Sequence, residues 1–390
     1  MKINHLEIKD ICDFIGGSQP PKSEFIYEPK SDYVRLIQTR DYKTDAFHTY
    51  IPEDSTKKFC TEEDIMIGRY GPPIFQICRG LKGAYNVALL KAEPKKGVDR
   101  EFLYYFLKQE SVFQYVDKLS ARTGGQTGVD LVSLNKYPVI IPADIKDQRN
   151  LISSVYAIDK KITLNNLINA ELKAITKTLY DYWFVQFDFP DANGNPYKTF
   201  GGKMVYNHSL KREIPEGWET KKFGEYAEVQ KGDLITAKDT KKGLIKVVAA
   251  GIDFSYTHSE YNREANTITI SGSGANAGYI NFWREPIFAS DCITIRGKSD
   301  TETLLLLHHL RFIQSHITNQ SSGSAQPHVY PSDIKILDYV LPKHNLVDNF
   351  GKLVIPMNNS ITCNLEQNQQ LIELRDWLLP MLMNGQVSVK

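Results

Sequence analysis

The chain has 390 residues, of which 42% are hydrophobic and 24% are charged, and its formal net charge is +1. These values are ordinary for a globular protein of two or three domains, and they provide no basic footprint of the kind that marks many nucleic-acid-binding proteins. The five cysteines form no Cys-x-x-Cys pair, and no apolar run reaches the roughly 18 residues of a membrane span. We therefore expect a cytoplasmic protein without a disulfide framework, a zinc ribbon or a signal peptide.

Two kinds of sequence pattern alternate along the chain, one typical of mixed α/β domains and one typical of long helices. Residues 1–142 combine short β-branched and aromatic runs with glycine and proline turns, which predicts a mixed α/β domain. Residues 143–187 predict a long helix, and 188–217 predict a linker rich in Gly, Pro and Asn. Residues 218–342 then repeat the mixed pattern, and 343–390 repeat the helical one.

An internal repeat underlies this alternation. At a shift of about 200 residues, matching pairs follow one another in the same order. They include Val129 with Val329, Pro142 with Pro342, Asn165 with Asn364, and Asn169 with Asn368. A run of matches at nearly one offset indicates a duplication, so we expect two similar mixed α/β domains in a pseudo-two-fold arrangement. An antiparallel pair of long helices, packed as a coiled coil, is expected to separate them.

The predicted helices carry a seam of apolar residues at alternating spacings of three and four, typical of helix–helix packing. A helix over residues 145–180 would be about 54 Å long. Four asparagines occupy seam positions: Asn165, Asn169, Asn364 and Asn368. One interpretation is that half-exposed helix faces simply tolerate Asn. The alternative is that these residues pair across the seam and set the register of the helices.

The second helix contains two residues that disfavour helix. Gly351 and Pro356 stand where the first helix has Ile152 and Ala157. Because proline removes a backbone hydrogen bond and clashes with the preceding turn, we expect a break or kink near residues 353–356.

Every fragment that resembles a catalytic motif is incomplete. Gly297-Lys298-Ser299 would end a phosphate-binding loop, but Cys292 stands where its first glycine is required. Gly71-Pro72-Pro73-Ile74 is similar to the Asp/Asn-Pro-Pro-aromatic signature of amino-methyltransferases, but it lacks the polar first residue and the final aromatic one. We therefore expect a binding protein with no catalytic residue and no metal site.

Three segments are similar to a known family. They are Leu179-Tyr-Asp-Tyr-Trp-Phe-Val-Gln-Phe-Asp188, Ile214-Pro-Glu-Gly-Trp-Glu219 and Leu374-Arg-Asp-Trp-Leu-Leu-Pro-Met-Leu-Met-Asn-Gly-Gln386. Together with the doubled architecture, they resemble the specificity (S) subunit of type I restriction–modification systems over essentially the whole chain. The first repeat departs from the pattern because it lacks a Pro-x-Gly-Trp start.

The resemblance implies a non-catalytic DNA-recognition subunit with two target recognition domains, each reading one half of a bipartite site in double-stranded DNA. The helices would set the spacing of the half-sites and dock two methyltransferase (M) subunits, which use S-adenosylmethionine. Restriction (R) subunits that use ATP and Mg²⁺ can join the assembly, and this chain itself would bind no cofactor. Two alternatives stay open, a stand-alone adenine DNA methyltransferase and a non-catalytic scaffold.

Candidate DNA-contacting residues lie near glycine-rich loops, where basic and aromatic residues cluster. Arg suits guanine, and Asn or Gln suits adenine, in the major groove. The candidates in the first domain are Arg35, Arg40, Arg69, Tyr70, Arg79, Lys82, Arg122 and Gln126. Those in the second domain are Ser273, Asn276, Arg284, Gln326 and His328. Each of them taken singly fits an ordinary solvated surface residue better than a DNA contact, and it is their grouping near glycine-rich loops that makes them candidates.

Overall fold

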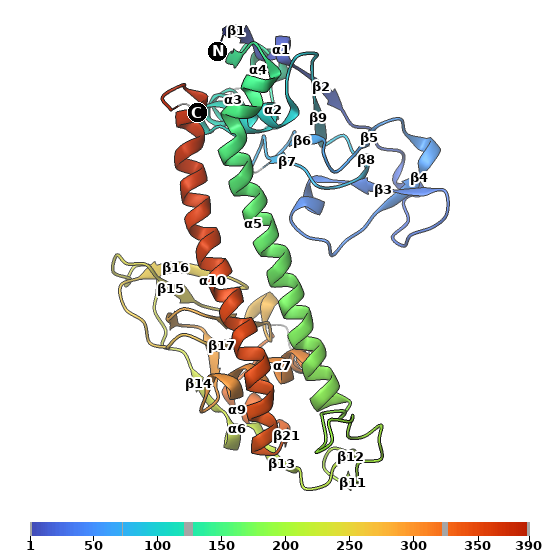
Figure 1. Cartoon of the computed structure of the whole chain (residues 1–390), viewed down its shortest axis with the longest axis vertical. Helices are drawn as coiled ribbons and strands as arrows, with labels where there is room; N and C mark the ends of the chain where they lie inside the picture. The colour runs from blue at the N-terminus through green and yellow to red at the C-terminus, as the bar shows by residue number, and fades with distance from the viewer. Residues whose placement is uncertain (1, 72, 121–127, 322–326, 388–390) are drawn as a thin grey trace. The chain divides into compact units, whose positions relative to one another are not determined.

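The computed structural model describes the chain except for residues 1, 72, 121–127, 322–326 and 388–390 (Figure 1). It divides into two compact units, one formed by Met1–Thr163 with Asn368–Lys390 and the other by Leu164–Gln367. Two long helices contribute to both units, α5 (Ile145–Tyr180) and α10 (His344–Met383).

The described residues of the first unit form three small sheets. One pairs β1 (Ile3–Glu7) with β10 (Pro138–Pro142). A second has the order β2 (Cys12–Gly16), β9 (Leu89–Pro94), β6 (Ile65–Gly68) and β7 (Ile77–Cys78). The third has the order β4 (Tyr50–Pro52), β3 (Tyr33–Ile37), β8 (Gly83–Tyr85) and β5 (Phe59–Cys60), with β3 and β8 parallel. The helices beside them are α1 (Ile8–Ile11), α2 (Arg100–Leu107), α3 (Glu110–Ser120) and α4 (Leu131–Leu134).

The second unit repeats this arrangement. β13 (Glu219–Lys222) pairs with β21 (Asp338–Leu341). A four-stranded sheet has the order β14 (Glu228–Lys231), β20 (Cys292–Arg296), β17 (Thr267–Ser271) and β18 (Ile280–Trp283). A three-stranded sheet has the order β16 (Phe254–His258), β15 (Ile245–Val248) and β19 (Ile287–Ala289), with β15 and β19 parallel. The helices are α6 (Phe223–Tyr226), α7 (Asp300–Phe312), α8 (Gln314–Ser321) and α9 (Pro331–Lys335).

The two units share one topology. The order β2-β9-β6-β7 in the first corresponds to β14-β20-β17-β18 in the second, and β4-β3-β8 corresponds to β16-β15-β19, down to the one parallel pairing. The duplication and the mixed α/β fold with an antiparallel helix pair, both predicted from the sequence, are confirmed.

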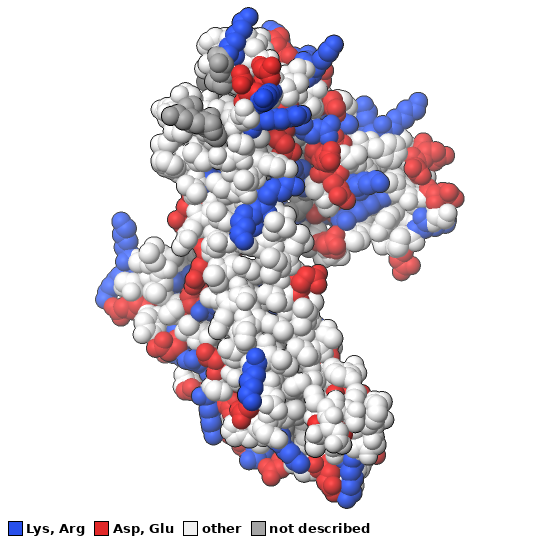
Figure 2. Space-filling view, viewed as in Figure 1, with Lys and Arg blue, Asp and Glu red and all other residues white. Residues whose placement is uncertain are grey.

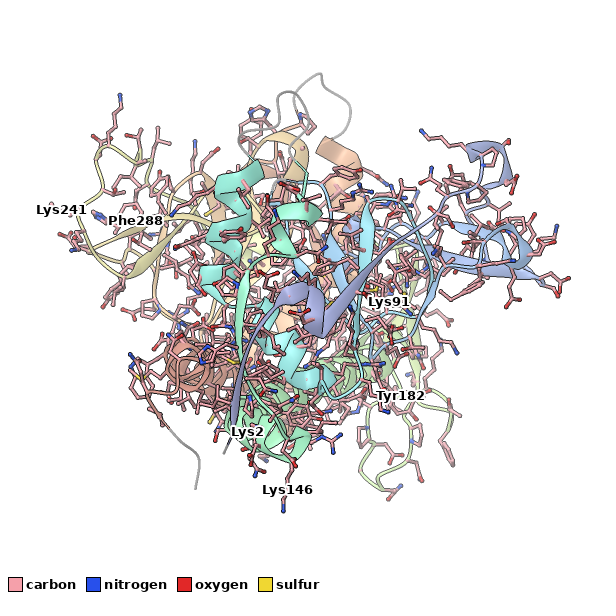
Figure 3. All side chains as sticks on the ribbon, turned by 90° about the horizontal axis from the view of Figure 1, so that it is seen from above. Lys2, Lys91, Lys146, Tyr182, Lys241 and Phe288 are labelled. Carbon is pink, nitrogen blue, oxygen red and sulfur yellow. The ribbon has the colours of Figure 1, made fainter. Side chains whose placement is uncertain are left out.

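His258 of β16 connects two parts of the second unit. Its ring contacts Phe288 on β19, with ring centroids 5.2 Å apart, and accepts a hydrogen bond from the backbone N–H of Lys241 (3.0 Å). Phe288 and Lys241 are both labelled in Figure 3.

Each unit builds its core around its part of the two helices. In the first unit, buried α2 residues such as Phe102 and Phe106 share one cluster with Val155 of α5 and Leu382 of α10. The start of α2 is set by Asp99, whose side chain accepts hydrogen bonds from the backbone N–H groups of two α2 residues.

The core of the second unit is rich in aromatic side chains. α5 continues into a π-helical turn, η4 (Asp181–Val185), and the buried Phe184 of this turn packs against Phe350 and Trp218. The segment between residues 188 and 217 contains the hairpin of β11 (Met204–Asn207) and β12 (Arg212–Pro215), and Ile214 of this hairpin joins the same core.

The expected break in the second helix is wrong, since α10 continues through both Gly351 and Pro356, whereas a kink near these residues stays a prediction. Pro356 cannot donate to the carbonyl of Lys352, but both residues lie on the exposed side of α10, where water can satisfy that carbonyl. Gly351 lies on the buried side, where a Cβ atom would come within 2.4 Å of the Thr301 hydroxyl. This glycine therefore serves the close packing of α10 on the start of α7.

No helix in the described part of the chain is both long and apolar enough to cross a membrane. Within the same residues, no group of three or more His, Cys, Asp or Glu side chains could hold a metal ion.

Candidate nucleic-acid interface

In the first unit, the loop after β6 lies against the segment that precedes α4. The Val129 N–H donates to the Arg69 carbonyl (3.0 Å), and Tyr70 and Gly128 form an antiparallel bridge. A Cβ atom on residue 128 would lie only 3.2 Å from the Tyr70 ring, so glycine permits this close approach. The Arg69 guanidinium lies 5.3 Å from the centroid of the Tyr70 ring, which is 40% exposed. A cation on an exposed aromatic face suits a phosphate and a stacked base.

The second unit repeats this contact at the equivalent positions. The Val329 N–H donates to the Gly272 carbonyl (3.0 Å), and Ser273 forms an antiparallel bridge with His328. Gly274 in this loop has φ +76°, a left-handed conformation that glycine adopts without strain. Both units therefore hold a glycine-containing loop after a central strand against the segment before a short helix.

The sequence-predicted residues of the second loop have different surroundings. The Ser273 hydroxyl donates to the Asp291 carboxylate (2.8 Å), so it holds the loop in place. Asn276 and His328 are exposed, and the His328 ring stacks with Tyr330 at a centroid distance of 6.0 Å. These two side chains are therefore accessible to a ligand.

Three further candidates, Arg122, Gln126 and Gln326, fall outside the described residues.

The remaining candidates of the first unit are not brought together with the loop of Arg69 and Tyr70 by any contact between described residues. Arg35 lies on β3 and donates to the Asp45 carboxylate (3.0 Å), while Arg40 is exposed and donates to the Thr49 hydroxyl (3.2 Å). The pKa of Asp45 is lowered, first by its hydrogen bond with His48 and second by its hydrogen bond with Arg35. Lys82 is exposed.

Arg79 and Arg284 directly follow the equivalent strands β7 and β18, yet their electrostatics differ. Arg79 forms an ion pair with Glu101 (2.6 Å) and lies 3.9 Å from the centroid of the Tyr104 ring. Burial acts to lower the pKa of Arg79, but its bond to Glu101 reverses the effect and raises that pKa. Arg284 lies 4.9 Å from the Phe282 ring centroid, and burial together with the nearby Arg311 lowers its pKa to about 10.

Sequence reasoning missed three basic residues of the second unit, Lys173 and Lys177 on α5 and Arg311 on α7. Lys173, Lys177 and Arg311 line one cavity of the second unit. The spacing of the two lysines, four residues apart on one helix face, was the only local signal. Arg311 had no signal, because its proximity to α5 arises only in the folded chain.

The seam asparagines of the second unit form hydrogen bonds across the two helices. The Asn364 side-chain amide donates to the Asn169 side-chain carbonyl (2.9 Å), and the Asn165 amide donates to Gln367 (2.8 Å). Asn165 is 0% and Asn169 is 4% exposed. The numbering of the pairs falls along α10 as it rises along α5, which makes the helices antiparallel. Asn368 is also buried, in the first unit.

The two helices also expose large apolar side chains. In the second unit these include Leu164, Leu167, Ile168, Ile175, Leu353 and Leu365, and in the first unit Leu374 and Trp377. Figure 2 shows the surface over α5 and α10 as mostly uncharged, whereas basic and acidic side chains are interspersed over the strand-rich parts. Exposed apolar side chains that are grouped on one surface are a common feature of sites of protein association.

The comparisons with known proteins agree with this description. The model of the type I restriction modification DNA specificity domain matches residues 2–174 and again residues 215–345. The MjaIX type I restriction enzyme specificity subunit of Methanocaldococcus jannaschii is 27% identical over 419 aligned residues, covering 98% of this chain and 93% of that protein. The HindI specificity subunit of Haemophilus influenzae is 22% identical, covering 74% of this chain and 77% of its own length.

A solved structure has the same fold. The S subunit of a type I restriction–modification system from M. genitalium superposes with a TM-score of 0.60 at 17% identity, covering 98% of this chain and 96% of that one. The resemblance stated from the three sequence segments is thereby confirmed.

Proposed function

The chain belongs to the type I restriction modification DNA specificity family, and we propose that each of its two recognition domains reads one half of a bipartite DNA site. Family membership confirms the prediction of a non-catalytic specificity subunit. It does not favour the stand-alone methyltransferase or the scaffold. The observation that carries the proposal is the duplicated loop contact, Arg69 to Val129 and Gly272 to Val329, which presents equivalent loops in the two units.

The exposed side chains at these loops supply the chemistry of recognition. Tyr70 offers a ring on which a base can stack, and Arg69 offers a cation for a phosphate or for guanine. In the second unit, Asn276 suits the edge of an adenine, and His328 offers a further donor or acceptor. With a net charge of only +1, the chain would leave most backbone phosphate contacts to its partners.

The two helices would act as the spacer and as the docking surface for two methyltransferase subunits. The exposed apolar residues of α5 and α10 suit such an obligate contact. The partners would bind S-adenosylmethionine and, where restriction subunits join, ATP and Mg²⁺, while this chain would hold no cofactor. The assembly would work in the cytoplasm, where its DNA substrate lies.

Sequencing the methylated adenines of cells that carry variant chains tests whether the recognition domains read the half-sites and the helices set the gap between them. Exchanging residues 1–142 for the corresponding domain of another family member should change one half-site and leave the gap unchanged. Inserting four residues after Asn169 lengthens α5 by about 6 Å and should widen the gap by about two base pairs without changing either half-site.

The matched control is a four-residue insertion after Asn193, in an exposed turn outside the helices, which should change neither the half-sites nor the gap. If the helix insertion altered the base preference, or the domain exchange altered the gap, the proposed roles would be wrong. The chain purified without methyltransferase subunits should methylate no DNA.

The docking surface has its own test. Trp377 is 57% exposed on α10, and exposed tryptophans often dominate the energy of protein interfaces. Trp377→Ala should weaken assembly with the methyltransferase subunits by tenfold or more. Phe200→Ala, which removes another exposed aromatic side chain (65%) outside the helices, should leave assembly unchanged. Equal affinities for the two variants would contradict docking at this part of α10.

A further inference from the structure

A cluster of basic side chains surrounds one cavity of the second unit. The cavity has a volume of about 570 Å³ and is lined by Lys173, Ala174 and Lys177 of α5, by Asp181 of η4, and by His308, Arg311 and Phe312 of α7. Arg284, directly after β18, lies within electrostatic range, because its charge and that of Arg311 both act on Lys173. We call Lys173, Lys177, Arg284 and Arg311 the basic cluster.

Most of this charge is not neutralised within the protein. Lys177 pairs with Asp181. Over the residues that the structure describes, Lys173, Arg284 and Arg311 form no ion pair, and the buried Nε atom of Arg284 has no hydrogen-bond partner. The carboxylate of the neighbouring Glu285 pairs with Lys246 (2.6 Å), and its effect on the pKa of Arg284 is smaller than the opposite effects of burial and Arg311.

The first unit neutralises the equivalent arginine. Arg79, which follows β7 as Arg284 follows β18, pairs with Glu101 of α2 (2.6 Å). Among the described residues, Arg284 has no such ion pair.

The unneutralised charges oppose folding. Loss of hydration and mutual repulsion lower the pKa of Lys173, of Arg284 and, through loss of hydration, of Arg311. Lowered pKa values of this kind are common at functional sites, where an external group can supply the missing negative charge. Lys173 and Arg311 keep solvent access, so a ligand can reach them.

The surroundings indicate which anion this is. The Tyr279 N–H donates to the Asn276 carbonyl (2.9 Å) in the candidate reading loop, and Tyr279 also interacts electrostatically with Arg311. The basic cluster is thus continuous with the loop that would read bases. We propose that Lys173, Arg284 and Arg311 bind one backbone phosphate of the DNA strand that passes the second recognition domain. This inference rests on the proposed function, and it adds a specific clamp that positions the strand.

The test uses the full chain assembled with its methyltransferase subunits and a duplex that contains its methylated site. Each phosphate contact adds about 0.9 to the slope of log affinity against log salt, or about eightfold in affinity at 0.1 M salt. Arg311→Gln should therefore lower affinity about eightfold at that salt and reduce the slope by about 0.9, with no change in the methylated sequence. Arg311→Lys should stay within about twofold of the parent chain, because a lysine still binds phosphate as a point charge.

Two controls separate the site from general charge and from unfolding. Lys222→Gln removes one positive charge that is already paired with Asp338 (2.7 Å), and it should leave affinity and slope unchanged. The thermal midpoint of Arg311→Gln should not fall below that of the parent chain, because the substitution removes repulsion. Duplexes carrying one neutral methylphosphonate at successive positions should reveal one position at which the parent chain and Arg311→Gln bind equally.

The outcomes are distinguishable. If the parent complex fails to bind the duplex, the proposed function itself fails. If it binds, but Arg311→Gln matches it in affinity and slope, or no methylphosphonate position abolishes their difference, the phosphate site is refuted. If Arg311→Gln weakens assembly with the methyltransferase subunits in the absence of DNA, the basic cluster binds an acidic protein surface instead, and the proposal is overturned.

Discussion

Because Asn169 and Asn364 share a hydrogen bond, replacing either one alone should lower the free energy of unfolding, whereas replacing both should not. Asn169 is 4% exposed, and its side-chain carbonyl accepts from the Asn364 amide at 2.9 Å. Asn364→Leu leaves that buried carbonyl facing an apolar side chain, and a buried polar group without a partner costs about 1–3 kcal/mol. We expect Asn364→Leu to lower the free energy of unfolding by about 2 kcal/mol.

Asn169→Leu should cost less, about 1 kcal/mol, because Asn364 is only half-buried and water can reach its amide. The double substitution removes both polar groups and places two apolar side chains at the seam. Replacing a buried polar pair by packed apolar groups is often neutral or stabilising. The double variant should therefore be at least as stable as the parent chain, so the two sites couple by about 3 kcal/mol.

Calorimetric unfolding of the full chain measures the four members of this cycle. Asn359→Leu, at an exposed position of the same helix, is the control and should change stability by less than about 0.5 kcal/mol. In cells, the double variant should methylate sites with more than one gap length, because a polar pair at a seam fixes register. Additive destabilisation by the two substitutions, or one unchanged gap in the double variant, would refute the assigned role of the pair.

Three further predictions concern stability and are read from the thermal midpoint of the full chain. Gly351→Ala should destabilise it by about 1–3 kcal/mol, because the new Cβ atom would lie 2.4 Å from the Thr301 hydroxyl, and adding Thr301→Ala should restore most of the loss. Pro356→Ala should raise stability by about 1–3 kcal/mol, since it returns a backbone donor to an exposed stretch of helix; an unchanged midpoint would contradict this account of α10. Burial, aided by Arg311 and Lys177, lowers the pKa of His308 to about 3, so the unfolded chain takes up a proton below pH about 6.5 while the native chain does not. His308 alone should therefore lower stability from pH 6.5 toward 3 by up to about 1.4 kcal/mol per unit, and His308→Gln should remove this part of the slope and leave the part from His309, whose pKa burial lowers to about 4.

Apolar periodicity along α5 allowed its ends to be read from the sequence. The helix expected over residues 145–180 is α5, because a seam spaced three and four apart is a local property of the chain. The break expected from the chemistry of Pro356 was wrong. Whether a proline interrupts a helix depends on which face it occupies, and the packing of α10 against Thr301 places this one toward solvent.

The candidate site was predictable only in part. The glycine-rich loop with Ser273 and Asn276 stood out because glycine and small polar residues are turn signals in any context. That the Ser273 hydroxyl is committed to Asp291, and that Arg79 is neutralised by Glu101, depends on residues distant in the sequence.

By itself, the sequence determined that the chain is a duplication of a mixed α/β domain and a long helix, because an internal repeat and a hydrophobic period depend only on the order of residues. It also carried the segments by which the family is identified. Only the tertiary structure decided which charges meet. Lys173, Arg284 and Arg311 come from a helix, a strand end and a second helix, and their repulsion exists only after these elements pack together. Coulomb energy depends on distance in space, which no local pattern records.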